Sequence, residues 1–147
     1  MLELDKVPCT GPIGPRRDGV DLPFWEGLAA GELRMQRCST CSHWWWAPSW
    51  RCGACGSWDL HWEAVPPRGK VFSWVRTHQP FSAAMKEFTP FVTLLVELPD
   101  AGNRRLFGIL VGPEDGLEVG APVTGVIQKP SELTSGMAVL RWTLATA

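Results

Sequence analysis

The chain lacks the features that would mark several common functional classes. Its 147 residues carry 14 Lys and Arg against 15 Asp and Glu, giving a net charge of −1, so no excess of positive charge is available for binding a polyanion. No apolar run approaches the roughly 18 residues of a membrane-spanning helix. The N-terminal segment is charged and proline-rich and does not read as a signal peptide. These absences predict a cytoplasmic protein and argue against nucleic-acid and membrane binding.

The sequence also lacks a recognisable catalytic set. Its histidines, His43, His61 and His78, stand at unrelated places, and neither a Gly-x-Ser-x-Gly nor a His-Glu-x-x-His motif occurs. A glycine-rich phosphate loop is missing as well, because the glycines at 11 and 14 are followed by proline and arginines and not by a helix. We therefore do not expect this chain to catalyse a reaction alone.

Four of the five cysteines form two CxxC pairs, Cys38 with Cys41 and Cys52 with Cys55, separated by ten residues. This spacing is typical of a closed tetrahedral zinc site of four thiolates. Such a site leaves no position for water or substrate, so the zinc is expected to be structural. Two disulfides would suit a secreted chain instead, and a rubredoxin-type iron site uses the same four ligands. A thioredoxin-like redox motif would need a βαβ pattern, which does not follow.

Tyrosine is absent, whereas tryptophan occurs nine times. Tryptophan is enriched at hot spots of protein interfaces, but a small metal module that is short of aliphatic core can also use it as filler. Trp44, Trp45 and Trp46 are consecutive, so they cannot all face one side of a strand or tight loop. At least one of them is therefore expected to point toward a partner or a ligand.

Three segments differ in pattern. Residues 1–21 are rich in proline and glycine without apolar periodicity and predict an extended or mobile arm, in which Cys9 is a free thiol.

Residues 22–66 predict a short helix with Asp21 as its cap and Pro23 in its first turn, followed by two strands that flank the cysteines as in a zinc ribbon. His43, within this ribbon, either supports the cysteines or is an exposed loop residue. Residues 66–69 predict a hinge.

Residues 67–147 read as strands and turns. Five segments are rich in β-branched or aromatic residues, at 70–78, 91–98, 105–111, 122–128 and 137–144, and no helical stretch separates them. The predicted fold is mainly β, with an N-terminal helix and a four-cysteine zinc ribbon followed by a five-stranded OB-fold barrel. The segment 79–90 is a longer loop with apolar residues, and loops of this kind often carry function.

Four stretches together resemble one protein family. They are Leu22–Leu28, Gly31–Cys38, Cys52–Ser57 and Arg68–Ser73. In this order they are similar to the DUF35 family, whose members join a rubredoxin-like zinc ribbon to an OB fold, and the resemblance runs from about Leu22 to the C-terminus. It implies a non-catalytic accessory subunit that forms a hetero-oligomer with a thiolase-superfamily enzyme and supports assembly and the acyl-CoA site.

The resemblance implies a complex that makes or breaks carbon–carbon bonds, and retro-aldol cleavage of a steroid side-chain acyl-CoA is the role we expect. An acyltransferase or condensing complex is the alternative within the family. An independent OB-fold module that binds nucleic acid or a small ligand is the alternative outside it.

Side-chain chemistry suggests two sets of contacts. The predicted partner contacts are aromatic residues of the helix and ribbon, namely Phe24, Trp25, Trp44, Trp45, Trp46 and Trp50. The predicted acyl-CoA contacts are apolar residues of the 79–90 loop with cations for a CoA phosphate, namely Arg76, Phe81, Met85, Lys86 and Phe88. The structural alternative is that the tryptophans pack the helix on the ribbon and the loop covers the end of the barrel.

Overall fold

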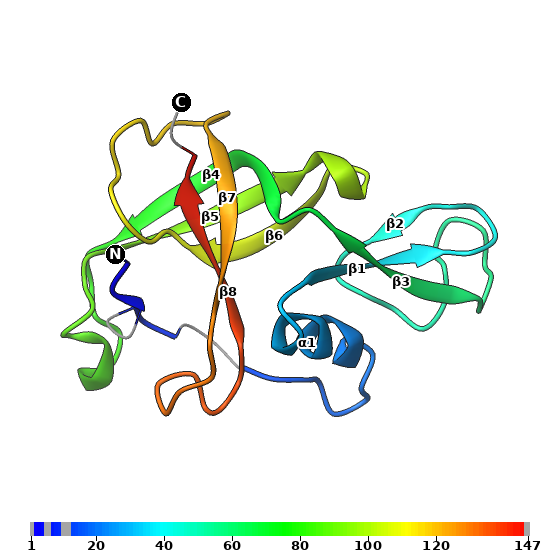
Figure 1. Cartoon of the computed structure of the whole chain (residues 1–147), viewed down its shortest axis with the longest axis horizontal. Coiled ribbons are helices and arrows are strands. Elements are labelled where there is room, and N and C mark those ends of the chain that lie inside the picture. The colour runs from blue at the N-terminus through cyan, green and yellow to red at the C-terminus, as the bar shows by residue number, and fades with distance from the viewer. Residues whose placement is uncertain (1, 5–6, 10–12, 146–147) are drawn as a thin grey trace.

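The computed structural model describes residues 2–4, 7–9 and 13–145 and contains two antiparallel sheets (Figure 1). The first sheet has the order β2-β1-β3 and follows helix α1; the elements are α1 (Leu22–Ala29), β1 (Leu33–Cys38), β2 (Trp44–Trp45) and β3 (Leu60–Val65). The second sheet has the order β6-β5-β4-β7-β8, with β4 (Arg68–Thr77), β5 (Phe91–Leu98), β6 (Arg104–Ile109), β7 (Pro122–Gln128) and β8 (Val139–Leu144). Two short 3-10 helices, η2 (Ala83–Met85) and η3 (Pro99–Ala101), lie on either side of β5. The predicted mainly β fold is confirmed.

The second sheet curls into a partly open barrel. Strand β5 alternates strictly between half-buried and buried side chains, as expected for a strand with one face on a core. The sheet curves until the chain just beyond β6 meets β8, where Leu110 and Trp142 form a parallel bridge and the Val111 N–H donates to the Trp142 carbonyl at 2.8 Å. This strand order and closure are those of an OB barrel.

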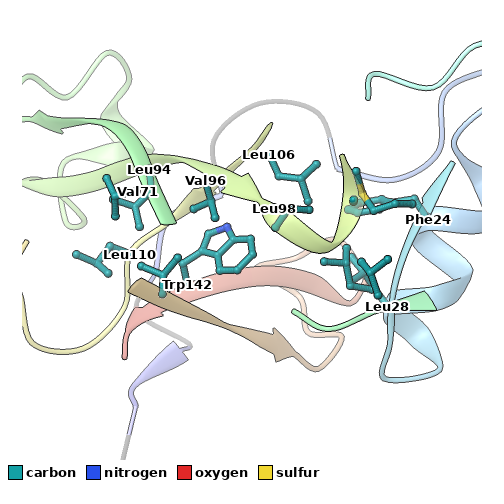
Figure 2. Packing of buried hydrophobic residues seen from close by; sticks show 14 of the residues in the cluster. Phe24, Leu28, Val71, Leu94, Val96, Leu98, Leu106, Leu110 and Trp142 are labelled. Carbon is teal, nitrogen blue, oxygen red and sulfur yellow. The ribbon is translucent and has the colours of Figure 1, made fainter. Parts of the chain in front are cut away.

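One apolar core runs through the barrel, the helix and the base of the ribbon. Trp142 is fully buried at its centre, with Val96 and Leu110 beside it, and the row of side chains continues to Phe24 and Leu28 of α1 (Figure 2). The two units are therefore packed on one another. The predicted hinge at residues 66–69 is wrong in this respect, because the junction is pinned to the barrel by the Gly125 N–H, which donates to the Pro67 carbonyl at 2.6 Å.

Helix α1 begins by different means than its sequence suggests. Pro23 does lie in the first turn, but the Asp21 side chain does not cap the helix. Its carboxylate instead accepts hydrogen bonds from the Arg16 N–H at 2.8 Å and the Trp25 indole N–H at 3.2 Å. At the other end Gly31 adopts a φ of +84°, which allows the chain to turn back toward β1. The described part of the chain has no helix long and apolar enough to cross a membrane.

The described parts of the N-terminal arm lie along the barrel. Val7 packs on Ile109 and Val111, and the Gln128 side-chain amide donates to the Leu4 carbonyl at 2.9 Å. Arg141 of β8 donates to the carbonyl of Pro8 at 3.0 Å. Residues 5–6 and 10–12 of the predicted arm lie outside the described residues.

Candidate metal centre and the adjoining cavities

The four cysteines predicted as metal ligands converge on one point at the tip of the ribbon. The sulfurs of Cys38 and Cys55 are 3.6 Å apart, those of Cys41 and Cys52 are also 3.6 Å apart, and all four lie within 4.8 Å of one another. A tetrahedron with metal–sulfur bonds of about 2.3 Å has edges of about 3.8 Å, whereas a disulfide needs about 2.05 Å. The spacing therefore fits a metal ion bound by four thiolates and does not fit two disulfides.

The backbone forms two equivalent loops around this point. In the first loop the Cys38 N–H donates to the His43 carbonyl at 2.9 Å, and the Ser42 N–H donates to the Cys38 carbonyl at 3.0 Å. The second loop repeats both bonds at 2.8 Å, from Cys52 to Ser57 and from Gly56 to Cys52. Ser42 and Gly56 occupy the same position with φ of +65° and +80°. The bend in the chain is thus made by a glycine in one loop and by a serine in the other.

Local dipoles favour thiolates at the buried cysteines. Desolvation alone would raise the pKa of Cys52, but N–H groups of Cys55 and Ala54 and the neighbouring Trp45 lower this pKa to about 6. The Trp45 indole N–H is buried and forms no hydrogen bond to another described residue, which suits a thiolate sulfur as its neighbour. The donor set and this unpartnered N–H fit a zinc ion coordinated by Cys38, Cys41, Cys52 and Cys55.

The exposed cysteines Cys41 and Cys55 differ from Cys38 and Cys52 because their pKa values are raised. The His43 N–H acts to lower the pKa of Cys41, but desolvation and the adjacent cysteines outweigh it and raise this pKa to about 12. Four thiolates this close repel one another, and a divalent cation would offset this repulsion. Four cysteine ligands would fill a tetrahedral ion, which is the arrangement of a closed structural site.

The consecutive tryptophans do not all face one side, as predicted, and each has contacts inside the molecule. Trp44 lies against the turn before β6, where a Cβ at Gly102 would come within 2.8 Å of its ring. Trp45 stacks on His43 with ring centroids 4.7 Å apart. The His43 ring in turn meets the Arg104 guanidinium of β6, so its side chain joins the ribbon to the barrel.

Trp46 packs on the helix. Its ring centroid lies 4.8 Å from that of Phe24, and the Phe24 ring meets Trp25 edge-on at 5.4 Å. Phe24 is only 8% exposed and belongs to the core, so it is not a free surface contact. Trp50 is 56% exposed and is the most accessible of the predicted partner residues. Trp58, which was not among the predicted partner residues, lies just before β3 and is 71% exposed.

The residues predicted to contact acyl-CoA are only partly brought together. Phe81, which is 87% exposed, and Met85 line one side of a hollow of about 490 Å³ that also includes Cys9 and Phe91. Phe88 lines a neighbouring hollow of about 550 Å³. Lys86 is exposed and lines neither hollow.

Arg76 is not free to meet a phosphate in this structure. Its guanidinium forms an ion pair with Glu114 and lies over the Trp74 ring, 5.4 Å from the ring centroid. Of the two predicted cations, Lys86 is thus the one without such a carboxylate contact among the described residues.

A third cavity, of about 270 Å³, lies between α1 and the edges of β6 and β8 and was not predicted. Its walls are apolar except at Cys9, Thr93 and Arg141. Arg141 is 4% exposed. The available signal was the single charged residue in the mainly apolar segment 137–144.

Comparison with known proteins gives consistent matches. The model of the C-terminal OB-fold domain of ChsH2 matches residues 62–128. A solved chain of the Ltp2-ChsH2(DUF35) aldolase is 27% identical with a TM-score of 0.77, covering 90% of this chain and 100% of that chain. A DUF35 protein of unknown function from Sulfolobus solfataricus is 17% identical with a TM-score of 0.57, covering 92% of this chain and 85% of that one, and supports the fold alone. No curated protein matches the chain.

Proposed function

This chain is a member of the DUF35 family, and we propose that it is the zinc-containing accessory subunit of an aldolase complex whose catalytic residues lie on a thiolase-superfamily partner. The proposed reaction is retro-aldol cleavage of an acyl-CoA, with a steroid side chain as the acyl group. The observation that carries this proposal is the match to a chain of the Ltp2-ChsH2(DUF35) aldolase, which is matched over the whole length of that chain.

The distribution of polar residues agrees with a supporting role. One histidine network joins Ser39, His61 and Glu63, with distances of 2.7 Å and 3.0 Å. It lies on the exposed face of the ribbon, away from all three hollows. A bound substrate would therefore have to find its catalytic groups on another subunit.

The proposed partner surface is the outer face of the ribbon tip. Trp50 and Trp58 are both more than half exposed there, and the Arg51 guanidinium lies over the Trp58 ring at 5.5 Å. Large aromatic and arginine side chains are the residues that most often dominate binding at protein interfaces. The metal centre would hold this surface in shape, because both residues flank the second cysteine loop.

The acyl-CoA is proposed to lie along the 79–90 loop, at the hollow lined by Phe81 and Met85. Lys86, at the C-terminal end of η2, is the proposed contact for a CoA phosphate. The apolar hollow would receive part of the acyl group, and the partner would cover the exposed Phe81 ring.

Co-expression with a thiolase-superfamily protein of the lipid-transfer type, followed by size-exclusion chromatography, tests the proposal. We expect a stable hetero-oligomer from the native chain and at least a tenfold weaker one from the Trp50→Ala, Trp58→Ala double variant, because hot-spot residues each contribute about 2 kcal/mol or more. Trp74→Ala, on the barrel, is the matched control and should assemble normally. A native chain that remains monomeric with this partner, with or without acyl-CoA, would contradict the proposal.

A further inference from the structure

The third cavity lies where the barrel is open. Helix α1 crosses the gap between the edges of β6 and β8, and the space of about 270 Å³ beneath it is walled by Phe24, Trp25, Leu28 and Trp46 on one side. Strand residues of β6 and β8 complete the wall. The cavity is thus a mainly apolar space built from rigid elements.

One charged side chain lies in this apolar wall. Arg141 is 4% exposed, and its three nitrogens donate to an amide oxygen, a backbone carbonyl and a sulfur of the chain. Nε donates to the Gln128 Oε1 at 2.9 Å, Nη1 to the Pro8 carbonyl at 3.0 Å and Nη2 to the Cys9 sulfur at 3.6 Å. Within residues 2–4, 7–9 and 13–145, no carboxylate forms an ion pair with it.

A buried cation without an anion is costly, because its desolvation is not offset by a charged partner. Desolvation accordingly lowers the pKa of Arg141, and only Cys9 opposes this shift. A guanidinium has five N–H groups, of which three are used by the contacts above. The bonds to Pro8 and Cys9 hold the N-terminal arm and the bond to Gln128 joins β8 to β7. None of these contacts requires a charged group, and two N–H donors are left for a ligand.

We propose that this cavity binds a small apolar carboxylate, with its carboxylate on Arg141 and its hydrocarbon body against α1. At about 30 Å³ per water-sized volume, a cavity of about 270 Å³ holds a ligand of roughly ten non-hydrogen atoms, the size of octanoate. The site goes beyond the accessory role proposed above, since it needs neither the partner subunit nor CoA.

Isothermal titration of the zinc-loaded full chain with octanoate, octan-1-ol and octylamine tests the proposal, because the three probes share one apolar body and differ in head group. Octanoate is expected to bind at least about tenfold more tightly than the alcohol, which corresponds to one charge-assisted hydrogen bond. Octylamine should bind most weakly, because its charge repels Arg141.

Four variants separate the cation from its structural role. Arg141→Gln should abolish the preference for octanoate over octanol, and Arg141→Lys should restore part of it. Gln128→Met loosens the arm but keeps the cation, so the preference should persist. Arg105→Gln removes an exposed arginine of the same barrel and should change nothing.

Three results would overturn the proposal. The first is absence of octanoate binding to the native chain. The second is equal affinity for octanoate and octanol. The third is a preference for octanoate that survives Arg141→Gln. None of these results depends on assembly with a partner, so they are distinct from failure of the proposed function.

Discussion

The tip of the ribbon and the barrel are stabilised by different means. Between residues 38 and 59 the buried side chains are Cys38, Pro48 and Cys52, and no aliphatic residue is among them. The barrel instead buries a continuous set of aliphatic side chains around Trp142 (Figure 2). A segment without an apolar core needs a metal to fold, whereas the barrel is held by burial alone. The two regions should therefore fail under different treatments.

Loss of the metal should have the largest effect, confined to the ribbon tip. Structural zinc contributes on the order of 10 kcal/mol in small zinc domains, so Cys52→Ser or strong chelation should unfold residues 38–59 and leave the barrel folded. Hydrogen exchange reports the unfolding of residues 38–59 and the folded state of the barrel, and mass spectrometry measures the metal content. Acid should release the metal as well, because protons compete for the thiolates. A Cys52→Ser chain that keeps one zinc and a protected ribbon would contradict the closed site.

Removing the central tryptophan should reverse this pattern. Trp142→Ala leaves a cavity at the centre of the barrel and should lower the free energy of unfolding by about 3–5 kcal/mol, measured by chemical denaturation. Trp58→Ala removes an indole that is 71% exposed and should change stability by no more than about 0.5 kcal/mol. Equal effects from the two substitutions would show that the barrel is not held by this core.

The two cysteine loops allow a finer comparison. Ser42→Gly should stabilise the ribbon by about 1 kcal/mol and Gly56→Ala should destabilise it by a similar amount, since only glycine adopts positive φ without a steric cost. Zinc affinity measured with a competing chelator checks both variants. If both substitutions change affinity in the same direction, the two loops are not equivalent.

The smallest expected effect concerns the ion pair at the turn after β5. A hydrogen bond from Arg68 and the attraction of its charge hold the pKa of Asp100 below its usual value. A depressed carboxyl pKa stabilises the fold above the unfolded pKa, and the benefit is lost as pH falls through the folded pKa. Asp100→Asn should lower the melting temperature slightly at pH 7 and leave it unchanged near pH 2. Because Arg68 is exposed, high salt should reduce the difference at pH 7.

Local patterns predicted the fold well. The β-branched and aromatic content of residues 91–98 predicted the bounds of β5 to the residue, and the CxxC spacing identified the sulfurs that converge. Strand β2 escaped prediction because it has only two residues, and β8 begins two residues later than predicted because positive φ at Ser135 and Gly136 extends the preceding turn.

Contacts between distant segments were not predictable from such patterns. The Asp21 carboxylate suits a helix cap, but its actual partners include Arg16, which the local helix pattern does not reveal. The cavity with Arg141 depends on α1, which lies more than 100 residues earlier in the chain and crosses the barrel. The bond from Arg141 to Pro8 likewise joins distant parts of the chain. The third cavity could therefore be found only from the structure.

The bond between Arg141 and Pro8 joins the first and last parts of the chain. During synthesis the ribbon and all four cysteines leave the ribosome well before β8 does, so the metal can be loaded while the barrel is still incomplete. The arm is made first, but its bond to Arg141 can form only after the last strand emerges. Its attachment is therefore completed late in assembly, and a chain that stops short of β8 would expose both the arm and the open barrel to proteases.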